Sequence, residues 1–158
     1  MHKKPKIPLR IIIQQDDFDV SEETKKIIVN RSGEIGAVVN FLGVVRDVSK
    51  GEKLQFMELE HYPGMTEKAL RNICLDAEKK WSLHGITIIH RVGKLYPSDK
   101  IVLVLVSSQH RREAFLATEF IMDFLKTRAP FWKKETLNSQ SKWVEEKASD
   151  ISILGRWS

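Results

Sequence analysis

The sequence contains only one cysteine, Cys74, among its 158 residues. A single cysteine excludes a disulfide within the chain and any metal site built from cysteines alone. Long apolar stretches are also missing, because the longest runs, residues 11–13 and 101–106, fall far short of the roughly 20 residues that cross a membrane. The five histidines are scattered, and none pairs with His, Cys or Asp at ligand spacing. We therefore expect neither a metal nor another cofactor.

Phosphate-binding glycine loops are absent as well. Neither Gly-x-Gly-x-x-Gly nor a P-loop occurs, which argues against nucleotide hydrolysis and dinucleotide redox chemistry. The basic residues 1–6 contain Pro5, and no small-residue cleavage site follows them, so no secretory leader is expected. The composition, 42% hydrophobic and 30% charged, is sufficient for a buried core. We expect a cytoplasmic protein with one domain, residues 1–158, that ends in an irregular tail from about residue 136.

Positive charge is concentrated in one segment. The net charge is +5, and residues 126–134 hold four basic residues and no acidic one. The four are Lys126, Arg128, Lys133 and Lys134, and Phe131 and Trp132 lie among them. Such a cluster indicates an anionic partner, which can be nucleic acid, a phosphorylated small molecule or an acidic protein.

The hydrophobic pattern predicts alternating strands and helices. Strands are expected at residues 9–14, 35–45, 54–62, 86–92 and 100–107, with the second one mostly buried and bulged at a glycine. Helices are expected at about 21–29, 66–81 and 108–127, with Ser21 and Thr66 as N-caps of the first two. Residues 131–158 show no regular pattern. This order favours an α+β fold with a largely antiparallel sheet and three main helices.

Two features of the predicted helices bear on chemistry. Cys74 lies on the apolar stripe of the second helix, where a thiol is a small hydrophobic group with a raised pKa rather than a nucleophile. His110 and Arg111 lie in the first turn of the third helix, which suits either an anion site or a solvated basic corner. That helix is roughly 30 Å long, so its two basic ends cannot share a pocket unless strands or a partner subunit bridge them.

Four segments carry a resemblance to a known family. They read GVVR at residues 43–46, LEHYPGMTE at 59–67, HRVG at 90–93 and MDFLKTRAPFWKKE at 122–135. Together they resemble the large, catalytic subunit of molybdopterin synthase, and the pattern runs in order from about Leu9 to Asp150. The last segment is long and unusual in composition, which makes a chance match improbable.

The resemblance implies a fold, a reaction and a partner. The fold would be of the α/β-hammerhead type, and two copies would form a homodimer within a 2:2 heterotetramer. The partner would be a small ubiquitin-like sulfur carrier with a thiocarboxylate on its C-terminal Gly-Gly. The activity would be that of a sulfurtransferase in molybdenum cofactor biosynthesis, which converts cyclic pyranopterin monophosphate to the dithiolene of molybdopterin.

The resemblance also assigns roles to individual residues. Lys126 and Lys133 would be the catalytic lysines, since a lysine with a lowered pKa can act as an acid, a base or a nucleophile. The residues implied to bind substrate, besides these two, are Val44, Val45, Arg46, His110, Arg111, Lys134, Glu135 and Lys147. Lys147 would come from the neighbouring protomer. The family has arginine at that position, and lysine keeps the charge but loses the bidentate fork.

Two other classes of function remain open at this stage. A nucleic-acid-binding module would use residues 126–134 with Phe131 and Trp132 as stacking groups, and its binding would depend steeply on salt. A purely structural partner of a ubiquitin-like protein would tolerate alanine at Lys126 and Lys133.

Overall fold

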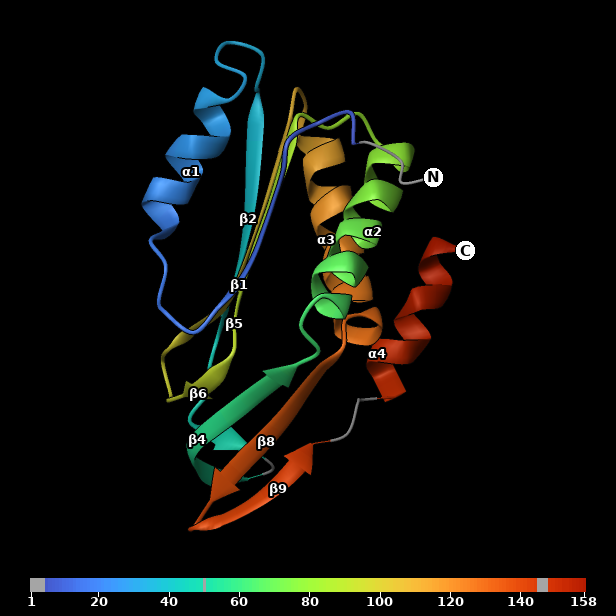
Figure 1. Ribbon diagram of the computed structural model, residues 1–158. Coiled ribbons are helices and arrows are strands. Elements are labelled where there is room, and N and C mark those ends of the chain that lie inside the picture. Colours follow the sequence, from blue (N-terminus) through green and yellow to red (C-terminus); the bar gives the residue numbers. More distant parts are fainter. Residues whose placement is uncertain (1–4, 50, 145–147) are drawn as a thin grey trace.

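The computed structural model describes residues 5–49, 51–144 and 148–158 (Figure 1). In chain order the elements are β1 (Leu9–Gln14), α1 (Val20–Val29), β2 (Ala37–Val44), β3 (Val48–Ser49), β4 (Glu52–His61), α2 (Met65–Lys80), β5 (Gly85–Arg91), β6 (Gly93–Leu95), β7 (Lys100–Ser108), α3 (Arg111–Arg128), β8 (Phe131–Leu137), β9 (Gln140–Val144), α4 (Ala148–Ser152) and a 3₁₀ helix (Ile153–Trp157).

The strands form two sheets. The first has the order β1-β5-β7-β2, and the second has the order β3-β4-β8-β9 with β6 paired to β4. Only β1 and β5 run parallel, and all other pairs of described strands are antiparallel. The predicted α+β class with a largely antiparallel sheet is therefore confirmed.

Strand β7 organises the first sheet because both of its faces are covered. Val102, Val104 and Val106 belong to the core under α2 and α3, whereas Leu103 and Leu105 pack with Phe18 and Ile27 on the side of α1. Figure 1 shows α1 on one face of this sheet and α2 with α3 on the other. A strand that is covered on both sides has apolar residues at successive positions, which explains why residues 101–106 are all apolar.

The second sheet has its own small core next to the first one. Its buried members are Val45, Leu54, Met57, Leu59, Leu95 and Leu137. Ile101, at the start of β7, packs against both this cluster and the core under α2 and α3. The two sheets are thus joined at the end of β7, and the loop after β2 lies at the same junction because Val45 N donates to Asp99 O at 2.9 Å.

The prediction of an irregular C-terminal tail was wrong. Residues 131–144 form the β8–β9 hairpin, which turns at Asn138 and Ser139 with φ of 48° and 64°. Positive φ at both turn residues is the geometry that two-residue hairpins prefer. Beyond it, the Trp157 ring packs edge-on against Trp81 and Phe120 at 5.7 and 5.4 Å. The lysine-rich segment is a strand because β4 pairs with it, not because of its own propensity.

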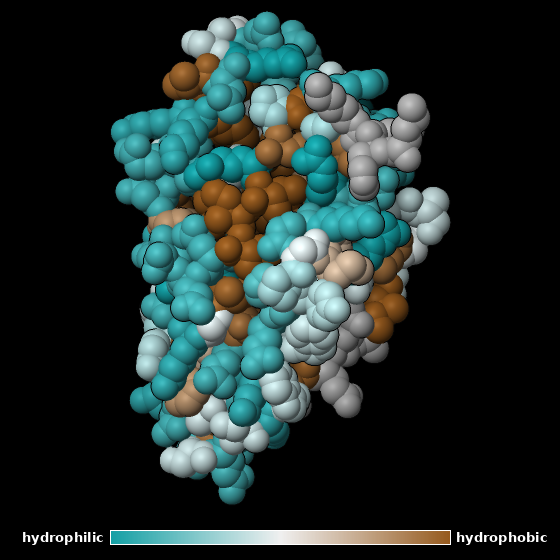
Figure 2. Space-filling model, viewed as in Figure 1, coloured by the Kyte–Doolittle hydropathy of each residue, from teal (hydrophilic) through white to brown (hydrophobic). Residues whose placement is uncertain are grey.

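The prediction for β2 was half right. The register shifts between Gly43 and Val44, as expected for a bulge, and a Cβ at Gly43 would lie 2.7 Å from Val102 Cγ1. However, β2 is not mostly buried, because it is an edge strand on which Phe41, Leu42 and Val44 are 38%, 37% and 45% exposed. At the other edge, where β1 lies between α1 and α2, hydrophobic side chains are also visible at the surface (Figure 2).

The predicted helices are present, but their starts differ from the expected caps. Asp19, not Ser21, caps α1, because its Oδ1 accepts from Glu22 N at 3.0 Å. Helix α2 begins after Gly64, and the Thr66 hydroxyl lies inside the first turn, where it donates to Tyr62 O at 2.9 Å. Helix α3 turns Ala117, Phe120 and Phe124 into the core, whereas Phe115 is 61% exposed.

Candidate active site

A cavity of about 690 Å³ lies at the junction of the two sheets. The loop after β2, the last turn of α3 and strand β8 meet around it. Its polar lining comes mainly from Arg46, His90, Lys126, Lys133, Glu135 and Asp150, and its apolar lining includes Val44, Val45, Leu59 and Phe131. A cavity of this size that mixes apolar walls with a few convergent polar groups is typical of a small-molecule site.

Lys126 and Lys133 reach this cavity from different elements. Lys126 is in the last turn of α3, where the helix dipole favours a cation, and Pro130 follows the end of the helix. Lys133 lies on β8 opposite Leu59 of β4, and it is half-buried. The chain reversal between α3 and β8 therefore brings two lysines seven positions apart to one site.

Strand alternation divides the residues of β8 between two faces. Lys133 and Glu135 line the cavity, whereas Lys134 points to the other face, where its Nζ lies 5.7 Å from the centre of the Trp143 ring. Glu135 is 6% exposed, so its carboxylate is the most enclosed charged group of the cavity. The cavity therefore contains one buried carboxylate beside two lysines.

Arg46 is held at the rim by the bulged end of β2. Ser98 N donates to Val45 O at 2.8 Å, and Val45 N donates to Asp99 O. Both backbone polar groups of the residue before Arg46 are therefore hydrogen-bonded. Val45 is 3% exposed and anchors the loop in the small core. Arg46 is exposed, so its guanidinium extends outward from a backbone that is held in place.

The sequence-based reasoning gave no role to His90, although this residue also lines the cavity. It ends β5, its ring stacks on Phe131 with the centroids 3.9 Å apart, and its Nδ1 lies 2.8 Å from Arg91 O. The pKa of His90 is lowered to about 4, mainly by burial; the hydrogen bond to Arg91 O opposes this, and the charges of Lys126 and His61 add to it. The only available signal was its position in the HRVG segment.

Other predicted site residues do not line the cavity. His110 and Arg111 lie at the opposite end of α3, which has 18 residues and is therefore about 27 Å long. Both side chains are exposed. The predicted position of Lys147 lies outside the described residues. The structure thus brings together Val44, Val45, Arg46, Lys126, Lys133 and Glu135 and leaves His110, Arg111 and Lys134 elsewhere.

Cys74 is fully buried in α2, as predicted. Burial raises the pKa of its thiol to about 12, so almost no thiolate exists at neutral pH. Within the described residues, no group of three or more His, Cys, Asp or Glu side chains is placed to hold a metal ion. None of the described helices is long and apolar enough to cross a membrane.

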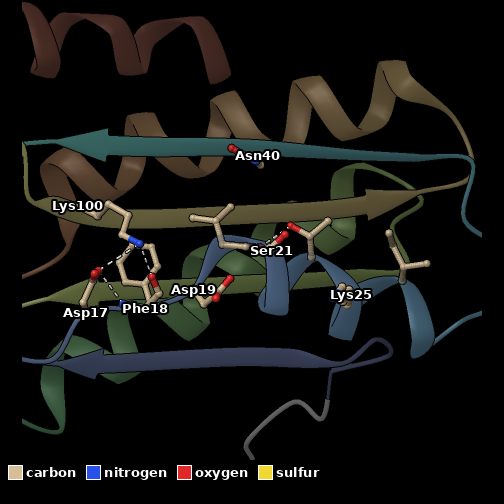
Figure 3. Close-up of a pocket in the computed structure, with 10 residues that line it drawn as sticks. Asp17, Phe18, Asp19, Ser21, Lys25, Asn40 and Lys100 are labelled. Carbon is tan, nitrogen blue, oxygen red and sulfur yellow. Dashed lines mark hydrogen bonds and ion pairs between the residues drawn. The ribbon is translucent and has the colours of Figure 1, made fainter.

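A second hollow lies between α1 and the face of the first sheet (Figure 3). Of its two lysines, Lys25 and Lys100, the second points toward the loop before α1, where its Nζ lies 3.3 Å from Asp17 Oδ1 and donates to Phe18 O. This contact also lowers the pKa of Asp17, although the hydrogen bond from Phe18 N lowers it more. Lys100 is therefore a tether between β7 and the β1–α1 loop, which makes the cavity at the sheet junction the better candidate.

Comparisons with known proteins agree on one family. The chain is 52% identical over 147 residues to the molybdopterin synthase catalytic subunit of Ralstonia nicotianae, which covers 93% of this chain and 83% of that relative. The structure of a molybdopterin biosynthesis MoaE protein from Burkholderia ambifaria is similar, with a TM-score of 0.81, 47% identity and coverage of 94% and 97% of the two chains.

The structure of molybdopterin synthase from Staphylococcus aureus is also similar, with a TM-score of 0.78, 36% identity and coverage of 85% of this chain and 96% of that chain. Residues 13–128 match the family described as MoaE protein. The chain therefore belongs to the MoaE protein family.

Proposed function

We propose that this chain is the catalytic subunit of a molybdopterin synthase. It would act in the cytoplasm, as a single domain, and transfer sulfur from the C-terminal thiocarboxylate of a small ubiquitin-like carrier to cyclic pyranopterin monophosphate. The observation that carries the proposal is the convergence of Lys126 and Lys133 beside Arg46 in one cavity, while the only thiol of the chain is buried. A chain without a usable thiol must take its sulfur from another molecule.

The cavity residues suit the chemistry of this transfer. Arg46 and the lysines attract the phosphate of the substrate, and the apolar walls accept a flat heterocycle. The carrier's thiocarboxylate sulfur first bonds to a substrate carbon as the C–O bond at that carbon breaks, and the oxygen leaves as water with protons supplied by a lysine ammonium and by solvent. A thioester then joins the carrier to the substrate. Water must add to its carbonyl carbon, which releases the carrier carboxylate, the substrate thiolate and two protons. A lysine ammonium stabilises the oxyanion in this step, and a neutral lysine amine or the Glu135 carboxylate accepts a proton from the water.

A nucleic-acid-binding role is less well supported by the geometry. Phe131, one of the two aromatic residues expected to stack on bases, is stacked on His90 inside the cavity. Lys133 faces the same cavity, whereas Lys134 faces the opposite side of the sheet, so the basic segment presents no continuous surface to a phosphate backbone.

Adjacent lysines on β8 supply a matched test. Because Lys133 lines the cavity and Lys134 does not, we expect Lys133→Ala to lower product formation at least a hundredfold and Lys134→Ala to stay within about threefold of wild type. The assay mixes each purified variant with a thiocarboxylated carrier and the pyranopterin and measures the dithiolene product by mass. Equal activity of the two variants, with folding confirmed by circular dichroism, would contradict the assignment of the cavity.

The distant basic residues fit a site shared between two copies of the chain. The outer edge of β2 pairs with no strand in the described part of the chain, and it exposes Phe41, Leu42 and Val44. Strand β2 has 8 residues and spans about 27 Å, close to the length of α3. If two β2 strands pair antiparallel about a two-fold axis, the partner's Ala37 end lies beside Val44 of this chain.

His110 is close to the Ala37 end, because Ala37 pairs with Ser108 and Gly36 N donates to Ser108 O at 3.0 Å. Dimerisation along β2 would therefore carry the partner copy's basic corner toward the cavity that contains Lys126. We propose such a homodimer, in which His110 and Arg111 bind the substrate of the neighbouring copy. The expected contribution of Lys147 belongs to the same proposal.

Mixed dimers test the shared site. Arg111→Ala and Lys126→Ala should each be nearly inactive alone. In a heterodimer of the two variants, a shared arrangement creates one cavity with both defects and one with neither, so activity recovers toward half that of wild type. If each cavity used only its own chain, every cavity would carry one defect. No recovery, in a sample whose heterodimers are verified by native mass spectrometry, would refute the sharing but not the reaction.

A further inference from the structure

The hydrogen bond of His90 fixes which of its ring nitrogens carries a proton. Nδ1 lies 2.8 Å from the backbone oxygen of Arg91. A carbonyl oxygen can only accept, so Nδ1 donates, and in the neutral ring Nε2 carries a lone pair instead of a hydrogen. The stack on Phe131, at 3.9 Å and 18° between the ring planes, holds the ring in this orientation.

The free nitrogen of this ring is open to the cavity. Nε2 makes no hydrogen bond with the described residues, and the only fully enclosed side-chain oxygen or nitrogen without a partner in that part of the chain is Glu113 Oε2. With Nδ1 bonded to Arg91 O, the edge of the ring that carries Nε2 is the one available to the cavity that His90 lines, even though the whole residue is only 6% exposed. A fixed acceptor at the wall of a site, with no partner among the residues that the structure describes, can accept from a donor on a ligand.

The remaining polar lining explains why such an acceptor matters. Arg46 and the ammonium forms of Lys126 and Lys133 are donors that suit a phosphate, but in this form they cannot accept a hydrogen bond from a ligand N–H. The carboxylates of Glu135 and Asp150 can accept, but they are charged and line the same cavity as the two lysines. His90 is a neutral acceptor embedded in an aromatic and aliphatic wall, which suits a flat ring rather than an anion.

We propose that His90 is a specificity-determining residue of this cavity, whose Nε2 accepts a hydrogen bond from a ring N–H of the pterin. This inference rests on the proposed function, because it takes the heterocycle of that substrate as the ligand. The phosphate of the substrate would then bind to the cationic side chains, and the ring would bind between His90 and the apolar wall. His90 would position the substrate without taking part in proton transfer.

Three substitutions separate the two nitrogens of the ring. His90→Asn keeps a donor near Nδ1 and removes the acceptor at Nε2. His90→Gln reaches the position of Nε2 with an amide oxygen. His90→Phe keeps a flat ring that can stack on Phe131 and removes both nitrogens. Each variant is compared with wild type in the full sulfur-transfer assay with the thiocarboxylated carrier, and thermal melting verifies that it folds.

We expect KM for the pyranopterin to rise about 10- to 100-fold in His90→Asn and His90→Phe, because a substrate N–H loses its partner. His90→Gln should recover most of this loss, and kcat should stay within about threefold in all three. The inhibition constant of inorganic phosphate, used as a probe of the cationic side chains, should not change.

Other outcomes overturn the inference. Normal KM in His90→Asn together with a defective His90→Gln would mean that only the Nδ1 bond matters and that the role is structural. A fall in kcat with a shifted pH profile and an unchanged KM would mean that His90 acts through Lys126 instead. Failure of the wild-type protein to form product with the carrier would refute the proposed function itself. Product formation by wild type with a normal KM in all three variants would refute only the role of His90.

Discussion

Burial of His90 makes the stability of the protein depend on pH in a defined window. The pKa of this ring is lowered from 6.5 to about 4 in the folded protein, mainly by desolvation. Between these values the unfolded chain binds a proton that the folded chain does not, so protonation favours unfolding. The stabilising contribution is complete above pH 6.5, and it is lost as the pH falls toward 4. For these two pKa values, going from pH 7 to pH 5 lowers the free energy of unfolding by about 2 kcal/mol.

Urea denaturation of wild type and His90→Phe at pH 7 and pH 5 measures the part of this loss in unfolding free energy that comes from His90. Phenylalanine keeps the stack on Phe131 but cannot be protonated, so the variant should lose about 2 kcal/mol less than wild type over this interval. Carboxylates such as Glu23, whose pKa is lowered chiefly by its bond to Arg10, titrate equally in both proteins and cancel. If both proteins lost the same free energy, His90 would already be protonated or solvated in the folded state.

Two further substitutions probe the support of the site. Cys74→Ala removes one fully buried sulfur, so the free energy of unfolding should fall by about 1 kcal/mol and Tm by roughly 2–4 °C, with sulfur transfer unchanged. A folded but inactive variant would show that the thiol is on the sulfur route. Gly43→Ala places a methyl group 2.7 Å from Val102 Cγ1, which cannot move freely in the core, so the bulge and Arg46 should shift. We expect KM for the pyranopterin to rise at least tenfold and Tm to fall by several degrees, because overpacking costs about 1–3 kcal/mol. An unchanged KM in the folded variant would mean that the bulge does not position Arg46.

Elements whose packing follows directly from their local hydrophobic pattern were predictable from the sequence. Strand β1 begins and ends at the expected residues, because its run of β-branched residues favours a strand and the two aspartates after it favour a turn. The run that forms β7 is apolar at every position because both of its faces are buried. The burial of Cys74 followed in the same way from the spacing of the apolar residues of α2. In each case, the local periodicity and the final packing agree.

The hairpin of β8 and β9 could not be found in this way. Its first strand contains two lysines and a glutamate, which have low strand propensity. It is stabilised by pairing with β4, which lies 70 to 83 positions earlier in the chain. The alternation that sends Lys133 into the cavity and Lys134 away from it exists only once this pairing is known. The same holds for His90, whose burial depends on the ring of Phe131 from β8.

The positions of the basic residues show which part of the predicted site a single copy of the chain can form. Arg46, Lys126 and Lys133 are brought together by elements of a single copy, so their convergence can be read from the fold. His110 and Arg111 cannot join them within one copy, because a straight helix of 18 residues separates the two ends. A helix keeps its ends apart, whereas an unpaired edge strand of the same length can bring the far end of a second copy close. The exposed apolar side chains of β2 are therefore the structural feature most directly linked to the unexplained part of the site.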